Sequence, residues 1–171
     1  MRTLCARTAA NSSTPSAQPS DKLIDIGAVA ADYYMVAILD RPGRDYSSRA
    51  GAAAYCVADQ SIDTFRHFHT ALYTHQPAET AASFPDDAAL IDTARQVGAG
   101  DAAADCINNG TYTAVVAGMA EATNVAHTPT VRINGQDYEL STPDALVATI
   151  KEIVGPVPGI DAPAPRPTAP S

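Results

Sequence analysis

The segment Tyr33–Leu39 (YYMVAIL) constrains the fold more than any other part of the chain. It is nearly continuous in apolar residues and contains aromatic and β-branched side chains. This pattern is typical of a strand that is buried on both faces inside a parallel or mixed sheet. The loop at 40–48, with its Pro-Gly turn, then ends the strand. The segment therefore indicates that the fold contains a sheet.

Residues 49–123 carry helical patterns instead. Arg49–Asp59 is alanine-rich, and Ser61–Tyr73 repeats large apolar side chains at the spacing of one helix face. The triplet Pro85-Asp86-Asp87 opens another helix. Two further helices are predicted at 102–107 and at about 111–123, and a short helical patch upstream covers 21–26. The central part of the chain is therefore a block of short helices.

A hairpin and a closing helix follow this block. Two strands are predicted at Thr130–Asn134 and Gln136–Leu140, because Asn134-Gly135 is a strong signal for a two-residue type I′ turn. Thr142 and Pro143 have the residue types of an N-cap and a first helical position. The order strand, helical block, hairpin and helix predicts an α/β or α+β architecture with a helical insertion.

The two ends of the chain lack these patterns. Residues 1–20 contain a cluster of Ser, Thr, Pro and Asn that favours turns, so we expect a divergent, partly disordered segment there. Residues 156–171 are rich in proline, which predicts an extended, disordered tail. One domain is expected at 21–155, with the helical insertion at about 49–123.

Charge and composition exclude several classes of protein. The formal net charge is −8, which disfavours a sequence-independent nucleic-acid binder. The longest apolar runs are far below the ~18 residues of a membrane-spanning helix, and the first ten residues have no apolar core of a secretory signal. Alanine is the most abundant residue and outnumbers Leu, Ile, Val and Phe combined. We therefore expect a core built largely from small side chains.

The histidines and cysteines show no metal-site spacing. The chain has no HExxH pattern, no glycine-rich phosphate loop and no paired cysteines of the zinc type. His67 and His69 are two positions apart and so do not share a helix face. We predict that His69 is a structural core histidine, and that His67 and His75 face solvent. Neither a metal nor a cofactor is expected.

The segment His127-Thr128-Pro129-Thr130, followed by a hairpin and a helix, resembles the cis-proline loop and C-terminal ββα unit of the thioredoxin fold. The helical block resembles the insertion of DsbA-like proteins of actinobacterial type. The resemblance covers about residues 21–155. The matching motifs are Asp25-x-Gly27, Ala37–Arg41, Ser48-Arg49-Ala50, Phe65-x-x-Phe68-His69-x-x-Leu72-Tyr73, Pro85-Asp86-Asp87 with Leu90-Ile91, Ala104-Asp105-Cys106 and Gly110-x-Tyr112.

This resemblance implies a DsbA-like thioredoxin fold and thiol–disulfide exchange with protein thiols or disulfides as substrates. It implies that Thr128 and a cis Pro129 contact the substrate, with His127 near the cleft. It also implies a structural disulfide between Cys56 and Cys106, whereas the residues alone allow two buried free cysteines. A disulfide would indicate an extracytoplasmic, oxidising location, in a secreted or cell-envelope protein.

The catalytic motif of the family, Cys-x-x-Cys, is incomplete here. Cys5 matches its first cysteine, but Thr8 stands at the second position, and only Met1–Leu4 could form the preceding strand. Arg7, if close, would lower the pKa of the Cys5 thiol. We expect weak or absent dithiol activity. The alternatives are an incidental exposed cysteine, a non-catalytic peptide-binding module, or a truncated reading frame of an active oxidoreductase. The sequence gives no indication of the oligomeric state.

Overall fold

The computed structural model describes residues 19–139 and 142–157, which form two compact units. The described part of the first unit is 33–130, and it contains helices α2 to α6. The described part of the second unit is 19–32, 131–139 and 142–157, and it contains α1, the strands β1 and β2, and α7. The catalytic-motif residues and residues 158–171 of the proline-rich tail lie outside the described residues.

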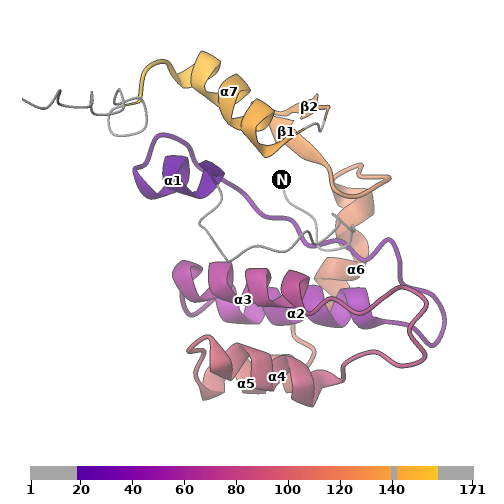
Figure 1. The fold of residues 1–171 in the computed structure, drawn as a ribbon. Helices are drawn as coiled ribbons and strands as arrows, with labels where there is room; N and C mark the ends of the chain where they lie inside the picture. Colours follow the sequence, from indigo (N-terminus) through magenta and orange to yellow (C-terminus); the bar gives the residue numbers. More distant parts are fainter. Residues whose placement is uncertain (1–18, 140–141, 158–171) are drawn as a thin grey trace, which may run out of the picture. The chain divides into compact units, whose positions relative to one another are not determined.

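Helix α2 is the centre of the first unit. It packs against each of the four other helices of that unit. Figure 1 shows α2 beside α3, and α4 beside α5. The helix bounds are α2 Tyr46–Ala58, α3 Ile62–Thr74, α4 Asp87–Gln96, α5 Asp101–Asn108 and α6 Thr113–Ala122.

Small side chains make up much of the core of this unit, as the composition predicted. Helix α2 buries a run of three alanines, Ala52–Ala54, against larger side chains of its neighbours, among them Phe65 and Phe68 of α3. Alanine lets helix backbones approach closely, and a glycine allows still more. Gly51 of α2 lies against Val116 of α6, where an added Cβ would come within 2.8 Å of a valine methyl carbon.

Local capping explains where the helices begin. The Ser61 side chain accepts a hydrogen bond from the amide of Thr64, and Asp86 accepts one from Ala89. Helix α2 begins earlier than the predicted Arg49. The two carboxylate oxygens of Asp40 accept hydrogen bonds from the amides of Ser47 and Ser48, both at 2.9 Å. A cap from outside the helix has no signature in the local sequence.

The prediction of a strand at Tyr33–Leu39 is wrong, because these residues form no strand in the structure. Met35 and Val36 are fully buried, so the predicted burial is present. A strand also needs a hydrogen-bonded neighbour. Within the described residues, the Met35 amide instead donates to the Tyr55 hydroxyl at 3.1 Å. The only sheet in the described part of the chain is the antiparallel pair β1–β2.

The second unit contains the predicted hairpin. Strands β1 (Val131–Ile133) and β2 (Gln136–Tyr138) pair with Val131 opposite Tyr138. Asn134 and Gly135 have φ values of 51° and 80°, as a type I′ turn requires. Both strands are shorter than predicted, and Leu140 lies outside the described residues.

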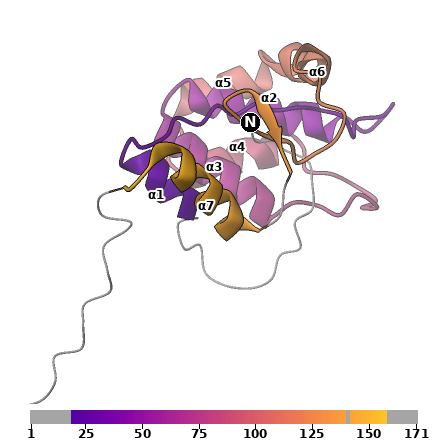
Figure 2. The same ribbon diagram turned by 90° about the horizontal axis from the view of Figure 1, so that it is seen from above.

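Helix α7 (Pro143–Val154) begins at the predicted cap, since the Thr142 hydroxyl accepts a hydrogen bond from the amide of Ala145. Helix α1 (Pro19–Asp25) begins two residues before the predicted patch and packs against α7. The two helices lie side by side in Figures 1 and 2. Leu23 of α1 is fully buried, whereas α7 has no buried residue.

Candidate functional site

The predicted site residues fall into two groups. Cys5, Arg7 and Thr8 lie outside the described residues. His127, Thr128 and Pro129 lie in the first unit, in the segment that follows α6. The geometry of the site can therefore be built from the 124–130 segment, which we call the proline loop.

The proline loop begins where α6 is closed by a left-handed residue. Asn124 has a φ of 51°, and the Val125 amide donates to the Ala120 carbonyl at 2.9 Å. Val125 is buried and so holds the start of the loop against the protein. Three residues later, the Thr128–Pro129 peptide bond is cis. The geometry implied for this position by the family resemblance is therefore present.

A hydrogen bond across the loop holds the cis-proline segment. The Thr130 hydroxyl donates to the His127 carbonyl oxygen at 2.6 Å, and Thr130 is buried. The His127 side chain is exposed, and Thr128 and Pro129 are half-buried. A short segment that is fixed at both ends but accessible between them can present its backbone to an extended polypeptide.

Cys56 of α2 and Cys106 of α5 form a disulfide, with their Cα atoms 5.7 Å apart. The alternative of two buried free thiols is therefore wrong. Cys56 is almost completely buried. The bond joins two helices that already pack together, at positions 50 residues apart in the sequence. Its place in the helical block makes it a structural bridge.

The other three histidines lie in the environments predicted for them. His67 and His75 are exposed, and His69 is buried. The His69 ring lies among Tyr33, Phe65 and Tyr73, with ring centroids 4.8–5.6 Å away. Within the described ranges, no group of three or more His, Cys, Asp or Glu side chains is arranged to hold a metal ion.

Arg49 connects the start of α2 with the start of α4. Its guanidinium donates a hydrogen bond to the carboxylate of Asp45, the residue that precedes α2. It also donates to the Asp87 carboxylate and to the Pro85 carbonyl oxygen at the start of α4, and each of the three distances is 3.0 Å. The hydrogen bond from Arg49 holds the pKa of Asp45 below its usual value. Ser48-Arg49-Ala50 was among the matching motifs, but sequence reasoning gave Arg49 no role, because its partner Asp87 is 38 residues away.

Comparison with known families decides the classification of this fold. A family model described as thioredoxin matches residues 4–152. The chain belongs to the thioredoxin family. The match includes both the proline loop and Cys5. It also begins only one residue before that cysteine.

Two solved structures from Mycobacterium tuberculosis place this thioredoxin-family chain more narrowly. The reduced disulfide bond oxidoreductase DsbG is 62% identical with a TM-score of 0.79, and the match covers 83% of this chain and 70% of that one. Oxidised DsbA has the same identity and TM-score, with 83% and 74% covered. The predicted DsbA-like thioredoxin fold is thus confirmed, as is the prediction of a thiol–disulfide oxidoreductase-like protein of the DsbA family.

A curated relative is a much larger protein than this chain. The serine/threonine-protein kinase PknE of M. tuberculosis is 37% identical over 105 residues, which are 58% of this chain. The matched part is only 18% of the kinase.

Among the described residues of this thioredoxin-family chain, no helix has the length and apolar character to cross a membrane.

Proposed function

We propose that the protein takes part in thiol–disulfide exchange with other proteins through one thiol, that of Cys5. The observation that most directly supports this proposal is the 62% identity to two M. tuberculosis proteins, DsbA and the disulfide bond oxidoreductase DsbG. Cys5 aligns within the residues matched by the family model. Thr8 occupies the position of the second, resolving cysteine.

The chemistry of a single thiol is limited to one exchange step. The Cys5 thiolate attacks one sulfur of a partner disulfide, a new bond forms between Cys5 and that sulfur, and the other sulfur leaves as a thiolate. The Thr8 hydroxyl cannot then attack the mixed disulfide. Release requires a second thiol, from the partner or from a small-molecule thiol. The protein therefore captures partners in a covalent adduct and turns over slowly.

The proline loop would hold the partner next to Cys5. An extended partner segment would hydrogen-bond to the backbone of Thr128 beside Pro129, with the exposed His127 ring at its edge. The hydrogen bond from Thr130 to the His127 carbonyl supports this role, because it reduces the freedom that the loop loses on binding. Arg7 would stabilise the Cys5 thiolate by its positive charge.

An extracytoplasmic, oxidising location fits this function. The Cys56–Cys106 disulfide supports it, because structural disulfides persist in secreted and cell-envelope compartments and are rare in the cytosol. A secreted or membrane-associated protein would meet partner proteins there as their disulfides form.

Replacing Cys5 by serine tests the proposal. The full chain is mixed with a protein that contains an accessible disulfide, alkylated, and analysed by non-reducing mass spectrometry. We expect a covalent adduct with the unchanged chain and none with Cys5→Ser. Disulfide reduction in an insulin assay should not exceed that of Cys5→Ala. A fast Cys5-dependent turnover, or an adduct that survives the Cys5→Ser change, would overturn the proposal.

The second candidate is a non-catalytic module that binds extended peptides at the proline loop, and the missing second cysteine favours it. Partner binding would then be the same for Cys5→Ser and the unchanged chain. A third reading is that residues upstream of Met1 complete the oxidoreductase. In-frame translation of the upstream DNA would establish this reading if it gave a sequence with the pattern of a strand, followed by Cys-Pro-x-Cys.

A further inference from the structure

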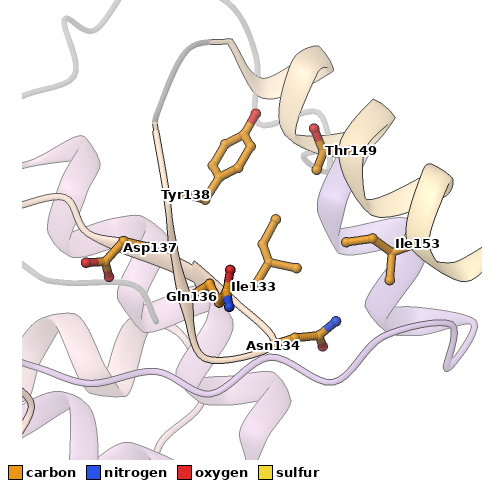
Figure 3. A pocket seen from close by; sticks show the side chains of 7 residues that line it. All are labelled: Ile133, Asn134, Gln136, Asp137, Tyr138, Thr149 and Ile153. Atoms are coloured by element: carbon orange, nitrogen blue, oxygen red, sulfur yellow. The ribbon is translucent and has the colours of Figure 1, made fainter.

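The second unit contains a pocket between its hairpin and its closing helix. Its volume is about 370 Å³, in the range of pockets that hold small ligands or peptide segments. Figure 3 shows the Ile133 and Tyr138 side chains on the hairpin side and Thr149 and Ile153 on α7. Asn134 lines the pocket from the turn of the hairpin. The pocket combines an aromatic ring and isoleucine side chains with neutral hydrogen-bonding groups.

Charge makes this pocket unsuitable for an ionic ligand. Asp137 is the only charged residue that lines it, and it forms an ion pair with Arg132 of the neighbouring strand. In Figure 3 the Asp137 side chain points away from α7. Tyr138, Asn134 and Thr149 offer hydroxyl and amide groups that can donate to carbonyl oxygens. An aromatic ring next to such donors is the chemistry that binds proline-rich segments.

The apolar side of the pocket is open to water. Ile153, which lines the pocket, is 52% exposed. Ile133 and Thr149 are half-buried. Covering this surface would stabilise the protein, because apolar area is removed from water. It would also protect the short hairpin from pairing with strands of other molecules.

We propose that the chain's own proline-rich tail, through the uncharged residues 162–165 (APAP), occupies this pocket. The tail leaves the described structure at Val157, four residues after Ile153, and Val157 is buried. The chain is therefore still packed on the second unit where the tail begins. Pro158-Gly159 is a turn signal that can reverse its direction.

The length of the tail fits this path. Four residues of polyproline II conformation span about 12 Å, whereas the α7 segment from Ile153 back to Thr149 rises only about 6 Å. Residues 162–165 can therefore run back along the pocket without strain. The tether also gives the segment a local concentration in about the millimolar range, at which a shallow pocket can be occupied. Proline-rich segments lose little conformational entropy on docking.

NMR of the full chain tests this docking. With labelled isoleucine methyl groups, we expect cross-relaxation between Ile133 or Ile153 and the protons of Ala162–Pro165. Ile153→Ser should abolish these signals, and Val154→Ser should retain them, because Val154 does not line the pocket. Both residues are partly exposed, so circular dichroism should show an unchanged helix content in both variants.

Proline substitutions in the tail provide a second, independent comparison. Replacing Pro163 and Pro165 by glycine should shift the Ile133 and Ile153 methyl resonances toward those of a chain that ends at Val157. The matched pair Pro167→Gly and Pro170→Gly should leave these resonances in place. The proposal is wrong if removing residues 158–171 does not shift them. It is also wrong if the tail signals depend on protein concentration, because a second copy would then be the occupant.

Discussion

Gly51 of α2 lies so close to Val116 of α6 that a β-carbon on the glycine would fall 2.8 Å from a Val116 methyl carbon. It would also lie 3.0 Å from the β-carbon of Met35. Non-bonded carbon atoms prefer a separation of about 3.5–4.0 Å. Three segments of the first unit thus meet where only glycine fits: α2, α6 and the buried 33–39 segment.

The first prediction is that Gly51→Ala destabilises the protein. Alanine favours a helix over glycine by about 1 kcal/mol, but the clash with Val116 forces the packing apart, and overpacking costs about 1–3 kcal/mol. We expect a lower midpoint of urea unfolding. Gly118→Ala is the matched control, because Gly118 is in α6 with no atom near its β-position. That change should stabilise the protein by about 0.5–1 kcal/mol. Equal effects of the two changes would contradict this account.

The second prediction concerns the disulfide. Replacing both Cys56 and Cys106 by alanine should lower the free energy of unfolding by about 2–5 kcal/mol, because the bond closes a loop of about 50 residues in the unfolded chain. Urea unfolding of the variant against the unchanged chain measures this loss. Cys5→Ser is the control and should leave the midpoint in place. A change below about 1 kcal/mol in the double variant would show that the helical block does not depend on its bridge.

The sequence predicted the helices of the first unit well, because their signals are local. The helix predicted at Ser61–Tyr73 and the one predicted to open at Pro85 correspond to α3 and α4, and Asn134-Gly135 forms the predicted turn. The small-residue core followed from the alanine content. Such features depend on residues within a few positions of one another, so a pattern in the sequence is enough to locate them.

The missed features depend on specific contacts that a local residue pattern does not encode. Tyr33–Leu39 has the composition of a strand, but its pairing depends on another segment, and the Met35 amide is bound by Tyr55. Asp40 caps α2 from outside the helix. For the site, the resemblance identified the proline loop, but the hydrogen bond from Thr130 to His127 could be seen only in the structure.

The third prediction is that Arg49→Ala weakens the attachment of α4 to α2. Arg49 is mostly buried and makes charge-assisted hydrogen bonds to Asp45 and Asp87, so its loss should cost about 1–2 kcal/mol of unfolding free energy. Arg49→Lys should recover only part of this unfolding free energy, because lysine lacks the planar guanidinium group that bonds to three acceptors at once. If the lysine variant were as stable as the unchanged chain, charge alone would explain the contact.

The same residue predicts a dependence on pH. The hydrogen bond from Arg49 lowers the pKa of Asp45 in the folded protein. A lowered pKa gives stability that is present above the unfolded value, about 3.9, and is lost as the pH falls through the folded pKa. The difference in unfolding free energy between the unchanged chain and Arg49→Ala should therefore shrink below about pH 4. Urea unfolding at pH 7, 4 and 3 measures this difference, and a constant difference would contradict it.

The last prediction concerns Tyr112, whose hydroxyl donates to Asp59 at 2.6 Å. This hydrogen bond is the largest of three causes that raise the pKa of Tyr112. The other two are desolvation and the negative charge of Asp59. Its stabilising effect is present below the ordinary tyrosine pKa of about 10 and is lost as the pH rises through the raised value. Asp59→Asn should move the pKa of Tyr112 down toward about 10.

Tyr55 serves as the control within the same molecule. Its ring centroid is 5.7 Å from that of Tyr112, and burial raises its pKa independently of Asp59. NMR titration of labelled tyrosine rings follows each group, with Tyr55→Phe and Tyr112→Phe for assignment. In Asp59→Asn the Tyr112 titration should shift down while that of Tyr55 stays high. A shift of both, or of neither, would show that Asp59 does not control the Tyr112 hydroxyl.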